Sequence, residues 1–340
     1  MTTASTPTIA LIGASGHGRR HRQNIADLGD RVRLVALGDI QDLPGETVPV
    51  YADHRRLLAE HKPDVVVICT PPHTHLPIAL DAVHAGADLL LEKPPVLDLD
   101  AHARLTEALA ATGRRCQVGF QALGSPTLPA LAALELGPLT HIAVAGAWWR
   151  PSSYWTRAPW SGRRAADGAL VNPFAHALMQ ALAIGAVRPP WTLELERFRS
   201  RDIEVDDTAA LRLTPSSGPV VTVAVTLAST EFIAGDITVT GTRGSAHVVY
   251  PQDRLDGVVL PGRVSLLENL LSGDPLVAPL SRTLPFTALA AEIMAAPDPV
   301  PLTGVAHDDG IALPGIAGLV RTAAARHALL SEVGDLPCAN

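Results

Sequence analysis

The chain contains 340 residues, of which 47% are hydrophobic and 18% charged, and its net charge is −7. A chain of this length carries enough apolar material for two cores, so we expect two domains. The acidic balance indicates neither nucleic acid nor an anionic membrane as a partner, and no apolar run approaches the ~20 residues of a membrane span. The N-terminal MTTASTPT lacks the basic and apolar regions of a signal peptide, so we expect a cytoplasmic protein.

The three cysteines, Cys69, Cys116 and Cys338, are odd in number and far apart. Neither a disulfide framework nor a C-x-x-C metal pair can be drawn from them, and no metal site is predicted.

The first 120 residues alternate short apolar runs with helical stretches, which is typical of a parallel α/β sheet. Strands are predicted at Ile9–Ile12, Val32–Leu37, Val65–Ile68, Leu89–Leu91 and Gln117–Phe120, and helices at Arg19–Leu28, His54–His61, Leu76–Ala85 and Asp100–Thr112. Gly29, Gly86 and Gly113 stand where helices are expected to end.

Beyond Phe120 the pattern changes. We expect a short helix up to Glu135, a strand at His141–Trp149, a loop at Trp148–Ala166 and a helix at Ala169–Ile184 that Pro173 interrupts near its start. Strands are then predicted at Leu193–Ser200, Thr208–Thr214, Val220–Ala228, Asp236–Thr240 and Ser245–Tyr250, before a last helix from Ile311 to Val333. Strands grouped without intervening helices indicate an antiparallel sheet, so the second domain is predicted to be α+β.

The stretch TIALIGASGHGRRH begins with a strand, passes through a glycine-rich turn and opens a helix, as a dinucleotide-binding G-x-G-x-x-G motif does. The three glycine positions hold Gly13, Ser15 and Gly18, so one glycine is replaced, and Gly16 is expected to supply the missing flexibility. The N–H groups and the dipole of the following helix would attract a pyrophosphate. The alternative is an ordinary strand–turn–helix corner.

Asp39 favours the first interpretation. It follows the second predicted strand, 21 residues after Gly18, where dinucleotide-binding domains carry the acidic residue that binds the adenosine ribose. A carboxylate at this position accepts hydrogen bonds from the ribose hydroxyls and repels a 2′-phosphate. NAD is therefore the predicted cofactor, and NADP is disfavoured.

Motifs further along the chain point to a family. Residues 64–75 read DVVVICTPPHTH and residues 84–95 read HAGADLLLEKPP, so a strand ends in Thr-Pro-Pro-His-x-His and the next one closes on Glu-Lys-Pro. The stretches VGFQ (118–121), DGALVNPFAH (167–176), DDTAALRL (206–213) and TVTGTRGSA (238–246) continue the pattern. Together they resemble the glucose-fructose oxidoreductase / inositol dehydrogenase / rhizopine catabolism (Gfo/Idh/MocA) family over most of the chain.

The resemblance implies a Rossmann domain at residues 1–122 and an α+β domain at residues 123–340 with a large, mostly antiparallel sheet. The last helix could pack back on the first domain. Family members usually form dimers or tetramers through the outer face of that sheet, so a homodimer or homotetramer is expected. Most of them transfer a hydride between nicotinamide and a carbinol carbon of a sugar, cyclitol or polyol, and we expect the same of this chain.

Three residues carry the predicted chemistry. Lys93 stands at the carboxyl end of a parallel strand, where its ammonium can stabilise charge developing on the reacting oxygen. His176 corresponds to the family's catalytic histidine and would transfer the proton. Asn172, which replaces an Asp found in many members, would position a neighbouring hydroxyl. The expected cofactor-binding residues are Gly13, Ser15, Gly16, His17, Gly18, Asp39, Thr70, Pro71, His75, Glu92, Lys93 and Gln121.

The segment WWRPSSYWTRAPWSGRR, residues 148–164, precedes the histidine helix and is predicted to cover the substrate. Stacked aromatic rings suit the C–H faces of a sugar ring, and arginines suit a carboxylate or phosphate. Tyr154, Trp155, Trp160 and Arg163 are the predicted substrate-binding residues. In the alternative interpretation, the tryptophans pack on the sheet and the arginines face water, and for Trp148 we expect packing.

Two departures from the family pattern keep other functions open. Asn172 and Met179 both replace frequent aspartates. One alternative is an enzyme that retains NAD and cleaves a glycosidic bond through transient oxidation. Another is a non-catalytic sensor of dinucleotide or sugar, although the intact Glu92-Lys93-Pro94 and His176 argue against it.

Overall fold

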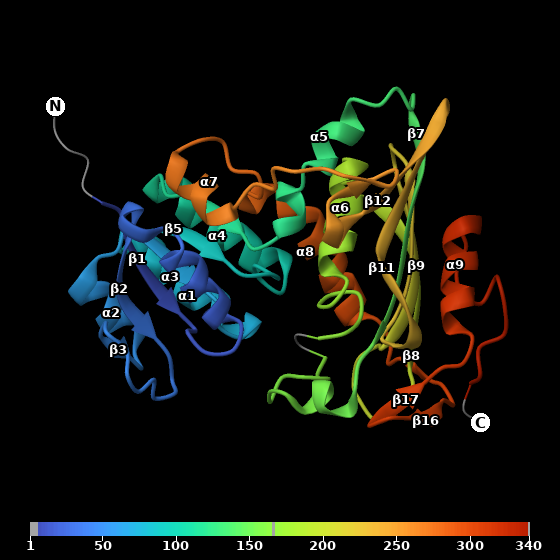
Figure 1. Cartoon of the computed structure of the whole chain (residues 1–340), viewed down its shortest axis with the longest axis horizontal. Coiled ribbons are helices and arrows are strands. Elements are labelled where there is room, and N and C mark those ends of the chain that lie inside the picture. Colours follow the sequence, from blue (N-terminus) through green and yellow to red (C-terminus); the bar gives the residue numbers. More distant parts are fainter. Residues whose placement is uncertain (1–5, 165–166, 339–340) are drawn as a thin grey trace. The chain divides into compact units, whose positions relative to one another are not determined.

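The computed structural model describes residues 6–164 and 167–338. The chain divides into two compact units, the first made of residues 1–120 and 265–287 and the second of residues 121–264 and 288–340 (Figure 1). Each unit is built around a sheet of its own. The chain therefore leaves the first unit near Phe120 and later returns to it for one short segment.

The first unit holds six parallel strands in the order β3-β2-β1-β4-β5-β6. They are β1 (Thr8–Ile12), β2 (Arg33–Gly38), β3 (Val50–Tyr51), β4 (Val65–Ile68), β5 (Asp88–Leu91) and β6 (Cys116–Val118). The central strands are runs of Val, Leu and Ile, and Ile9, Val67 and Leu91 are fully buried. Strands of this composition require helices on both faces of the sheet.

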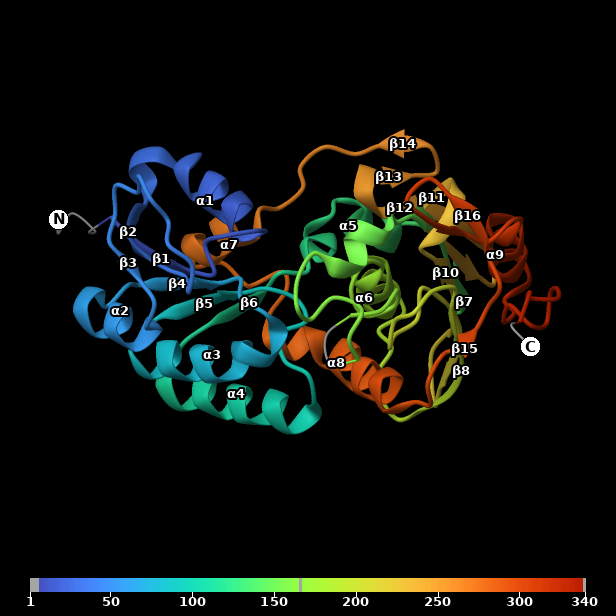
Figure 2. The same ribbon diagram turned by 90° about the horizontal axis from the view of Figure 1, so that it is seen from below.

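Helices cover both faces of this sheet. Figure 2 shows α1 (Gly18–Ala26) and α7 (Leu266–Ser272) on one face, and α2 (His54–His61), α3 (His75–His84) and α4 (Leu99–Thr112) on the other. The carboxylates of Asp53 and Asp98 cap α2 and α4 by accepting hydrogen bonds from backbone N–H groups of the first turn. Gly113 ends α4 in the left-handed conformation.

The register of the strands brings four loops to one edge of the sheet. In the sheet, β2 lies on one side of β1 and β4 on the other, so the direction in which the chain adds strands reverses at β1. β1 therefore marks a topological switch point. Ile12 is paired with Gly38 and with Ile68, and Ile68 is paired with Leu91. The carboxyl ends of β1, β2, β4 and β5 therefore finish level, and the segments that follow them start side by side.

The second unit holds nine strands in the order β14-β13-β12-β11-β7-β10-β9-β8-β15. They are β7 (Leu139–Trp149), β8 (Trp191–Arg199), β9 (Thr208–Pro215), β10 (Val220–Thr226), β11 (Ala228–Gly241), β12 (Gly244–Val249), β13 (Arg254–Leu255), β14 (Val258–Val259) and β15 (Val300–Pro301). Only two of the pairings in this described sheet, β10 with β7 and β15 with β8, are parallel. The predicted fold class, a Rossmann sheet followed by a large and mostly antiparallel sheet, is confirmed.

Two helices pack on opposite faces of this second sheet. α6 (Ala175–Ile184) and α9 (Ile316–Arg326) both contact β7, β10 and β11, and Figure 1 shows them on different sides. Small and branched side chains, including Ala145, Ala224, Ile316 and Val320, form the buried layer under α9. The last helix thus lies on the second sheet.

The remaining elements are short or link these layers. They are α5 (Thr127–Ala132), α8 (Leu280–Ala295), the hairpin of β16 (Val305–His307) and β17 (Gly310–Ala312), and the 3₁₀ turns η1 (Gly29–Arg31), η2 (Pro72–Thr74), η3 (Gln121–Gly124), η4 (Ser152–Thr156) and η5 (Tyr250–Gln252). The predicted loop at Trp148–Ala166 contains η4, and its last two residues lie outside the described residues. Residues 1–5 of the N-terminal stretch MTTASTPT also lie outside the described residues.

Two helices are shorter than predicted. The helix expected from Ala169 starts at Ala175, because Pro173 disfavours helical backbone at Asn172 and has no N–H to donate. The helix expected from Ile311 to Val333 starts at Ile316 and ends at Arg326. Gly315 and His327, which flank it, both have left-handed backbone conformations.

In the described parts of the chain, no helix is both long enough and apolar enough to cross a bilayer. The three cysteines are free thiols.

Candidate cofactor and substrate sites

The glycine-rich turn after β1 is shaped by close backbone contacts. A Cβ at Gly13 would lie 2.5 Å from the carbonyl oxygen of Cys69, and a Cβ at Gly18 would lie 1.8 Å from the carbonyl oxygen of Gly13. Gly16 has no such neighbour, but its φ of +52° is in the left-handed region. Gly13 and Gly18 are therefore required by crowding and Gly16 by its conformation. Ser15 stands at a position that tolerates a side chain.

Asp39, which follows β2, is tied directly to this turn. One carboxylate oxygen accepts a hydrogen bond from the backbone N–H of Ser15 at 2.8 Å, and the other accepts one from that of Gln41 at 3.0 Å. Partial burial acts to raise the pKa of Asp39, but the hydrogen bonds from Gln41 and Ser15 outweigh it and lower the pKa. The carboxylate is therefore charged and fixed beside the turn.

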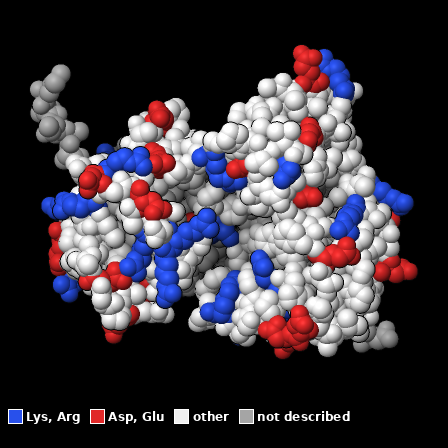
Figure 3. Space-filling view, viewed as in Figure 1, with Lys and Arg blue, Asp and Glu red and all other residues white. Residues whose placement is uncertain are grey.

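The N-terminus of α1 adds positive potential at the same place. The first N–H groups of a helix have no partner within the helix, and its dipole attracts anions. On the face seen in Figure 3, Lys and Arg side chains gather over α1, whose sequence includes Arg19, Arg20 and Arg22. Here the N–H groups of Gly18 and Arg19 donate to the carbonyl oxygens of Ser15 and Gly16. The helix dipole and the nearby arginines therefore provide the favourable field for an anion.

The segment after β4 is held by a buried histidine. The ring of His75, at the start of α3, contacts the carbonyl oxygen of Pro94 through Nδ1 at 2.9 Å and that of Thr70 through Nε2 at 2.8 Å. Burial lowers the pKa of His75, so the ring is neutral and donates only one of these two hydrogen bonds. His75 thus links the loop after β4 to the loop after β5.

Glu92 and Lys93 directly follow β5, and the bond between Lys93 and Pro94 is cis. The buried carboxylate of Glu92 contacts Nε2 of His21 at 2.8 Å and accepts a hydrogen bond from the backbone N–H of Lys93 at 3.1 Å. Burial acts to raise the pKa of Glu92, yet the imidazoles of His17 and His21 beside it hold the pKa well below its usual range. A Cβ at Gly119 would lie 2.8 Å from this carboxylate, so Gly119 leaves the room that it needs.

In the second unit, Asn172 lies in the turn before α6. Its Nδ2 donates to a carboxylate oxygen of Asp167 at 2.9 Å, and the other oxygen of Asp167 accepts from the backbone N–H of Gly162 at 2.9 Å. His176 lies in the first turn of α6, where its ring stacks on that of Tyr250 with centroids 5.5 Å apart. Asn172 and His176 are thus not on one helical face.

The aromatic segment before α6 is partly packed and partly open. Trp155 is buried against Gly162, and Trp148 packs on Phe174 with ring centroids 4.3 Å apart. The guanidinium of Arg157 lies 3.7 Å from the ring centroid of Tyr154 and 4.8 Å from that of Trp160. Arg163, one of the predicted substrate-binding residues, forms an exposed ion pair with Glu204.

The family now follows from comparison with known sequences. A model of the oxidoreductase family with an NAD-binding Rossmann fold matches residues 8–120, and a model of the GFO/IDH/MocA C-terminal domain matches residues 130–247. The chain belongs to the Gfo/Idh/MocA family. The family and the NAD cofactor predicted from the sequence are thereby confirmed.

Individual relatives match shorter segments. Inositol 2-dehydrogenase 4 of Saccharopolyspora erythraea is 34% identical over 152 residues, which is 42% of each chain. Inositol 2-dehydrogenase of Rubrobacter xylanophilus is 30% identical over 119 residues, 33% of this chain and 34% of that protein. The matches therefore span less than half the length of these relatives.

Among solved structures, the WlbA dehydrogenase from Bordetella pertussis, in complex with NADH and UDP-GlcNAcA, is similar with a TM-score of 0.75. The likeness covers 85% of this chain and 96% of that chain at 24% identity, and it shows a common fold.

The structure of this Gfo/Idh/MocA member also places residues that sequence reasoning missed. These residues are His21, which contacts Glu92, Asp167, which contacts Asn172, and Gly119, which leaves room for the carboxylate of Glu92. His21 stands four residues after His17, which is one helical turn, and this spacing was the available signal. Asp167 opens the quoted stretch DGALVNPFAH, but nothing in the spacing indicates that its carboxylate turns back to Asn172.

Proposed function

We propose that this chain is an NAD-dependent oxidoreductase that transfers a hydride between nicotinamide and a CH–OH carbon of a sugar-, cyclitol- or polyol-like substrate. The observation that carries the proposal is that the carboxyl ends of β1, β2 and β5 lie at the same edge of the sheet. The phosphate-binding turn, the ribose-binding candidate Asp39 and Lys93 follow these strands and therefore lie along that edge.

The residues at this edge fit NAD. The turn combines a left-handed Gly16 with the crowded Gly13 and Gly18. It directly precedes α1, whose dipole would attract a pyrophosphate. Asp39 is charged, and its neighbour Ile40 is 91% exposed without a cationic side chain, so a 2′-phosphate would meet only repulsion.

Bound NAD would supply the hydride chemistry. Lys93 would donate a hydrogen bond to the reacting oxygen and stabilise the charge that develops on it. Lys93 is one of only two lysines in the chain, the other being Lys62 on α2's C-terminal side. His176 would take up or release the proton of the substrate hydroxyl, and Asn172 would hold a neighbouring hydroxyl.

The substrate class rests on two kinds of support. The relatives named above are inositol dehydrogenases, and the WlbA structure holds UDP-GlcNAcA, so both concern polyhydroxylated rings. In this chain, the half-buried rings of Tyr154 and Trp160, joined through Arg157, would offer a flat surface to the C–H face of such a ring.

The scarcity of lysine permits a sharp test. Lys93→Met should abolish NADH formation with inositols and sugars, while the Kd for NAD stays within about tenfold because the adenosine and pyrophosphate contacts remain. Lys62→Met is the matched control and should retain full turnover. Unchanged turnover in Lys93→Met would contradict the proposal. NAD that co-purifies with the protein, together with substrate turnover without net NADH, would instead favour the glycosidic-bond-cleaving alternative.

We further propose a homodimer or homotetramer that uses the outer face of the second sheet, as the resemblance implies, and a cytoplasmic location. Because α9 covers β7, β10 and β11 on one face, a partner on that face would have to bind beside α9. Analytical ultracentrifugation would measure the assembly, and a monomer at micromolar concentration would contradict this expectation.

A further inference from the structure

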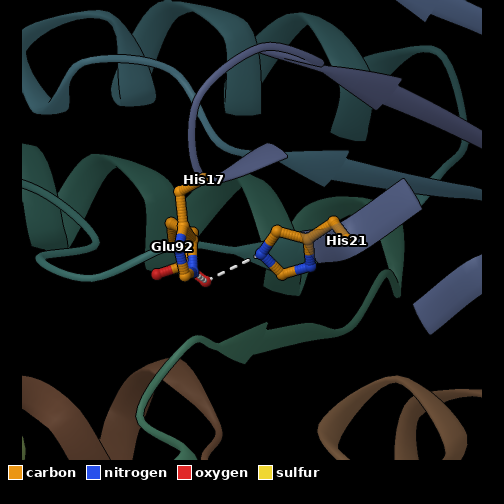
Figure 4. Close-up of side chains that lie close together, drawn as sticks. All are labelled: His17, His21 and Glu92. Carbon is orange, nitrogen blue, oxygen red and sulfur yellow. Dashed lines mark hydrogen bonds and ion pairs between the residues drawn. The ribbon is translucent and has the colours of Figure 1, made fainter. Parts of the chain in front are cut away.

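Two histidines and a glutamate meet at the phosphate-binding turn. His17 precedes α1, His21 lies one turn further along it, and Glu92 follows β5. Figure 4 shows both imidazole rings against the carboxylate of Glu92. One carboxylate oxygen lies 2.8 Å from Nε2 of His21 and 3.7 Å from Nε2 of His17. These three side chains, called here the His-His-Glu cluster, can each direct one ligand atom to a common point, and the ligand atoms lie within 4.8 Å of one another.

The spacing within the cluster suits a small divalent ion. Tetrahedral zinc binds imidazole nitrogen and carboxylate oxygen at about 2.0–2.2 Å, which places neighbouring ligand atoms roughly 3.3 Å apart. The two contacts of the Glu92 oxygen, at 2.8 and 3.7 Å, lie on either side of that separation. Small side-chain movements would therefore complete three corners of a tetrahedron and leave the fourth to water.

The types of ligand and the solvent exposure of His17 agree with this geometry. Two imidazoles and one carboxylate form a ligand set that zinc uses when one coordination position stays open. The carboxylate of Glu92 is buried and would balance the charge of the ion, whereas the side chain of His17 is 57% exposed and provides a route from solvent. The backbone N–H of Lys93 donates to the other carboxylate oxygen, which orients the group toward the histidines.

We propose that His17, His21 and Glu92 bind a divalent transition-metal ion such as Zn²⁺, and that this ion and the dinucleotide exclude each other. The second half rests on the proposed function and on the cofactor contacts that the sequence predicts for His17 and Glu92. A histidine or carboxylate whose ligand atom is engaged by the metal cannot offer that atom to a nucleotide. The enzyme would thus be inhibited by zinc at its phosphate-binding turn.

The test uses the full-length protein, freed of metal by chelation and dialysis and free of nucleotide. Zn²⁺ is titrated by calorimetry, and Co²⁺ is added in parallel because tetrahedral Co²⁺ absorbs visible light. We expect one site, and His17→Gln should weaken it at least about tenfold, since even loss of an outer-shell partner costs roughly 10–100-fold. His54→Gln is the matched control, because it removes a histidine that lies outside the cluster and contacts the carboxylate of Asp81 at 2.8 Å. It should leave the affinity unchanged.

Several outcomes would overturn the proposal. If wild type shows no tetrahedral Co²⁺ spectrum, or if His17→Gln binds Zn²⁺ as tightly as wild type, the cluster is not a metal site. If saturating NAD leaves the Zn²⁺ affinity unchanged, mutual exclusion is wrong although the site stands. Failure of NAD itself to bind would refute the proposed function but not the metal site, because Zn²⁺ binding is measured without nucleotide.

Discussion

The amide nitrogen of Asn172 donates a hydrogen bond to the buried carboxylate of Asp167, and this contact defines the orientation of the Asn172 side-chain amide. With Nδ2 committed to Asp167, the carbonyl oxygen is the end of Asn172 that can accept from a hydroxyl group. A buried carboxylate thus lies beside Asn172, and in the proposed reaction any contact with a substrate hydroxyl would be made by the amide oxygen.

Asp167→Asn should impair the proposed reaction. An amide at this position would turn an N–H toward either Asn172 or the backbone N–H of Gly162, leaving a buried donor unpaired at a cost of about 1–3 kcal/mol. We expect kcat/KM to fall by about tenfold or more, while the Kd for NAD stays unchanged. Steady-state kinetics and an NAD titration would measure both. Asp298→Asn, which removes only an exposed partner of Arg164, is the control, and an equal loss there would argue against a positioning role.

Asp39→Ser should weaken NAD binding and relax the discrimination against NADP. The substitution removes a charged acceptor from the ribose and also releases the turn at Ser15, so we expect a loss of about 2–3 kcal/mol, or roughly 30- to 150-fold in Kd. NADP should lose less, because the repulsion of its 2′-phosphate disappears. Binding of both nucleotides is measured by calorimetry beside Asp42→Ser, an exposed carboxylate three residues away. Equal NAD affinity in wild type and Asp39→Ser would show that another residue holds the ribose.

Two glycines of the turn should respond differently to alanine. In Gly18→Ala the new Cβ meets the Gly13 carbonyl oxygen at 1.8 Å, so the backbone must move, and we expect a loss of about 1–3 kcal/mol in the free energy of unfolding together with weaker NAD binding. Gly16→Ala has open space and should cost about 1–2 kcal/mol from its left-handed backbone. Gly318→Ala in α9 has open space without a left-handed backbone and serves as the control. Urea denaturation would rank the three, and a harmless Gly18→Ala would refute the crowding argument.

The strand, turn and helix that form the predicted dinucleotide-binding turn can be recognised in the sequence because their signals are local. The strand, turn and helix from Thr8 to His21, and the position of Asp39 after β2, depend on residues within one βαβ unit. Buried parallel strands such as β4 and β5 can also be predicted, because they appear in the sequence as short apolar runs whose two faces helices must cover.

Long-range contacts account for what the sequence does not show. The segment 265–287 returns to the first unit, where the side chain of Gln117 donates a hydrogen bond to Asn269. No periodicity in the sequence predicts a contact between residues 152 positions apart. The pairing of His21 with Glu92 likewise joins residues that are 71 positions apart. Pro173 predicted an interruption near the start of α6 but not the start at Ala175. The loop before the helix is held by Asp167, whose contacts depend on the folded turn.

The buried ring of His75 should make stability depend on pH. Burial lowers the folded-state pKa of His75 below the ordinary value of 6.5, against the opposing effect of its contacts with the carbonyl oxygens of Thr70 and Pro94. Above about pH 6.5 the ring is neutral in both states, so its contribution is fully present. As the pH falls below that value, the unfolded chain binds a proton that the folded chain does not, and the free energy of unfolding falls by up to about 1.4 kcal/mol per pH unit.

His75→Gln should therefore flatten the pH dependence of stability between about pH 6.5 and the lower folded-state pKa, even though it lowers stability at pH 7.5. All five tryptophans lie in the second unit, so urea denaturation is followed by far-ultraviolet circular dichroism, which also reports on the first. His73→Gln, at an exposed position two residues earlier, is the matched control and should keep the wild-type profile. His102, whose pKa burial also lowers, remains in every variant and cancels in the comparison. An unchanged slope in His75→Gln would mean that the ring accepts a proton in the folded state as readily as in the unfolded one.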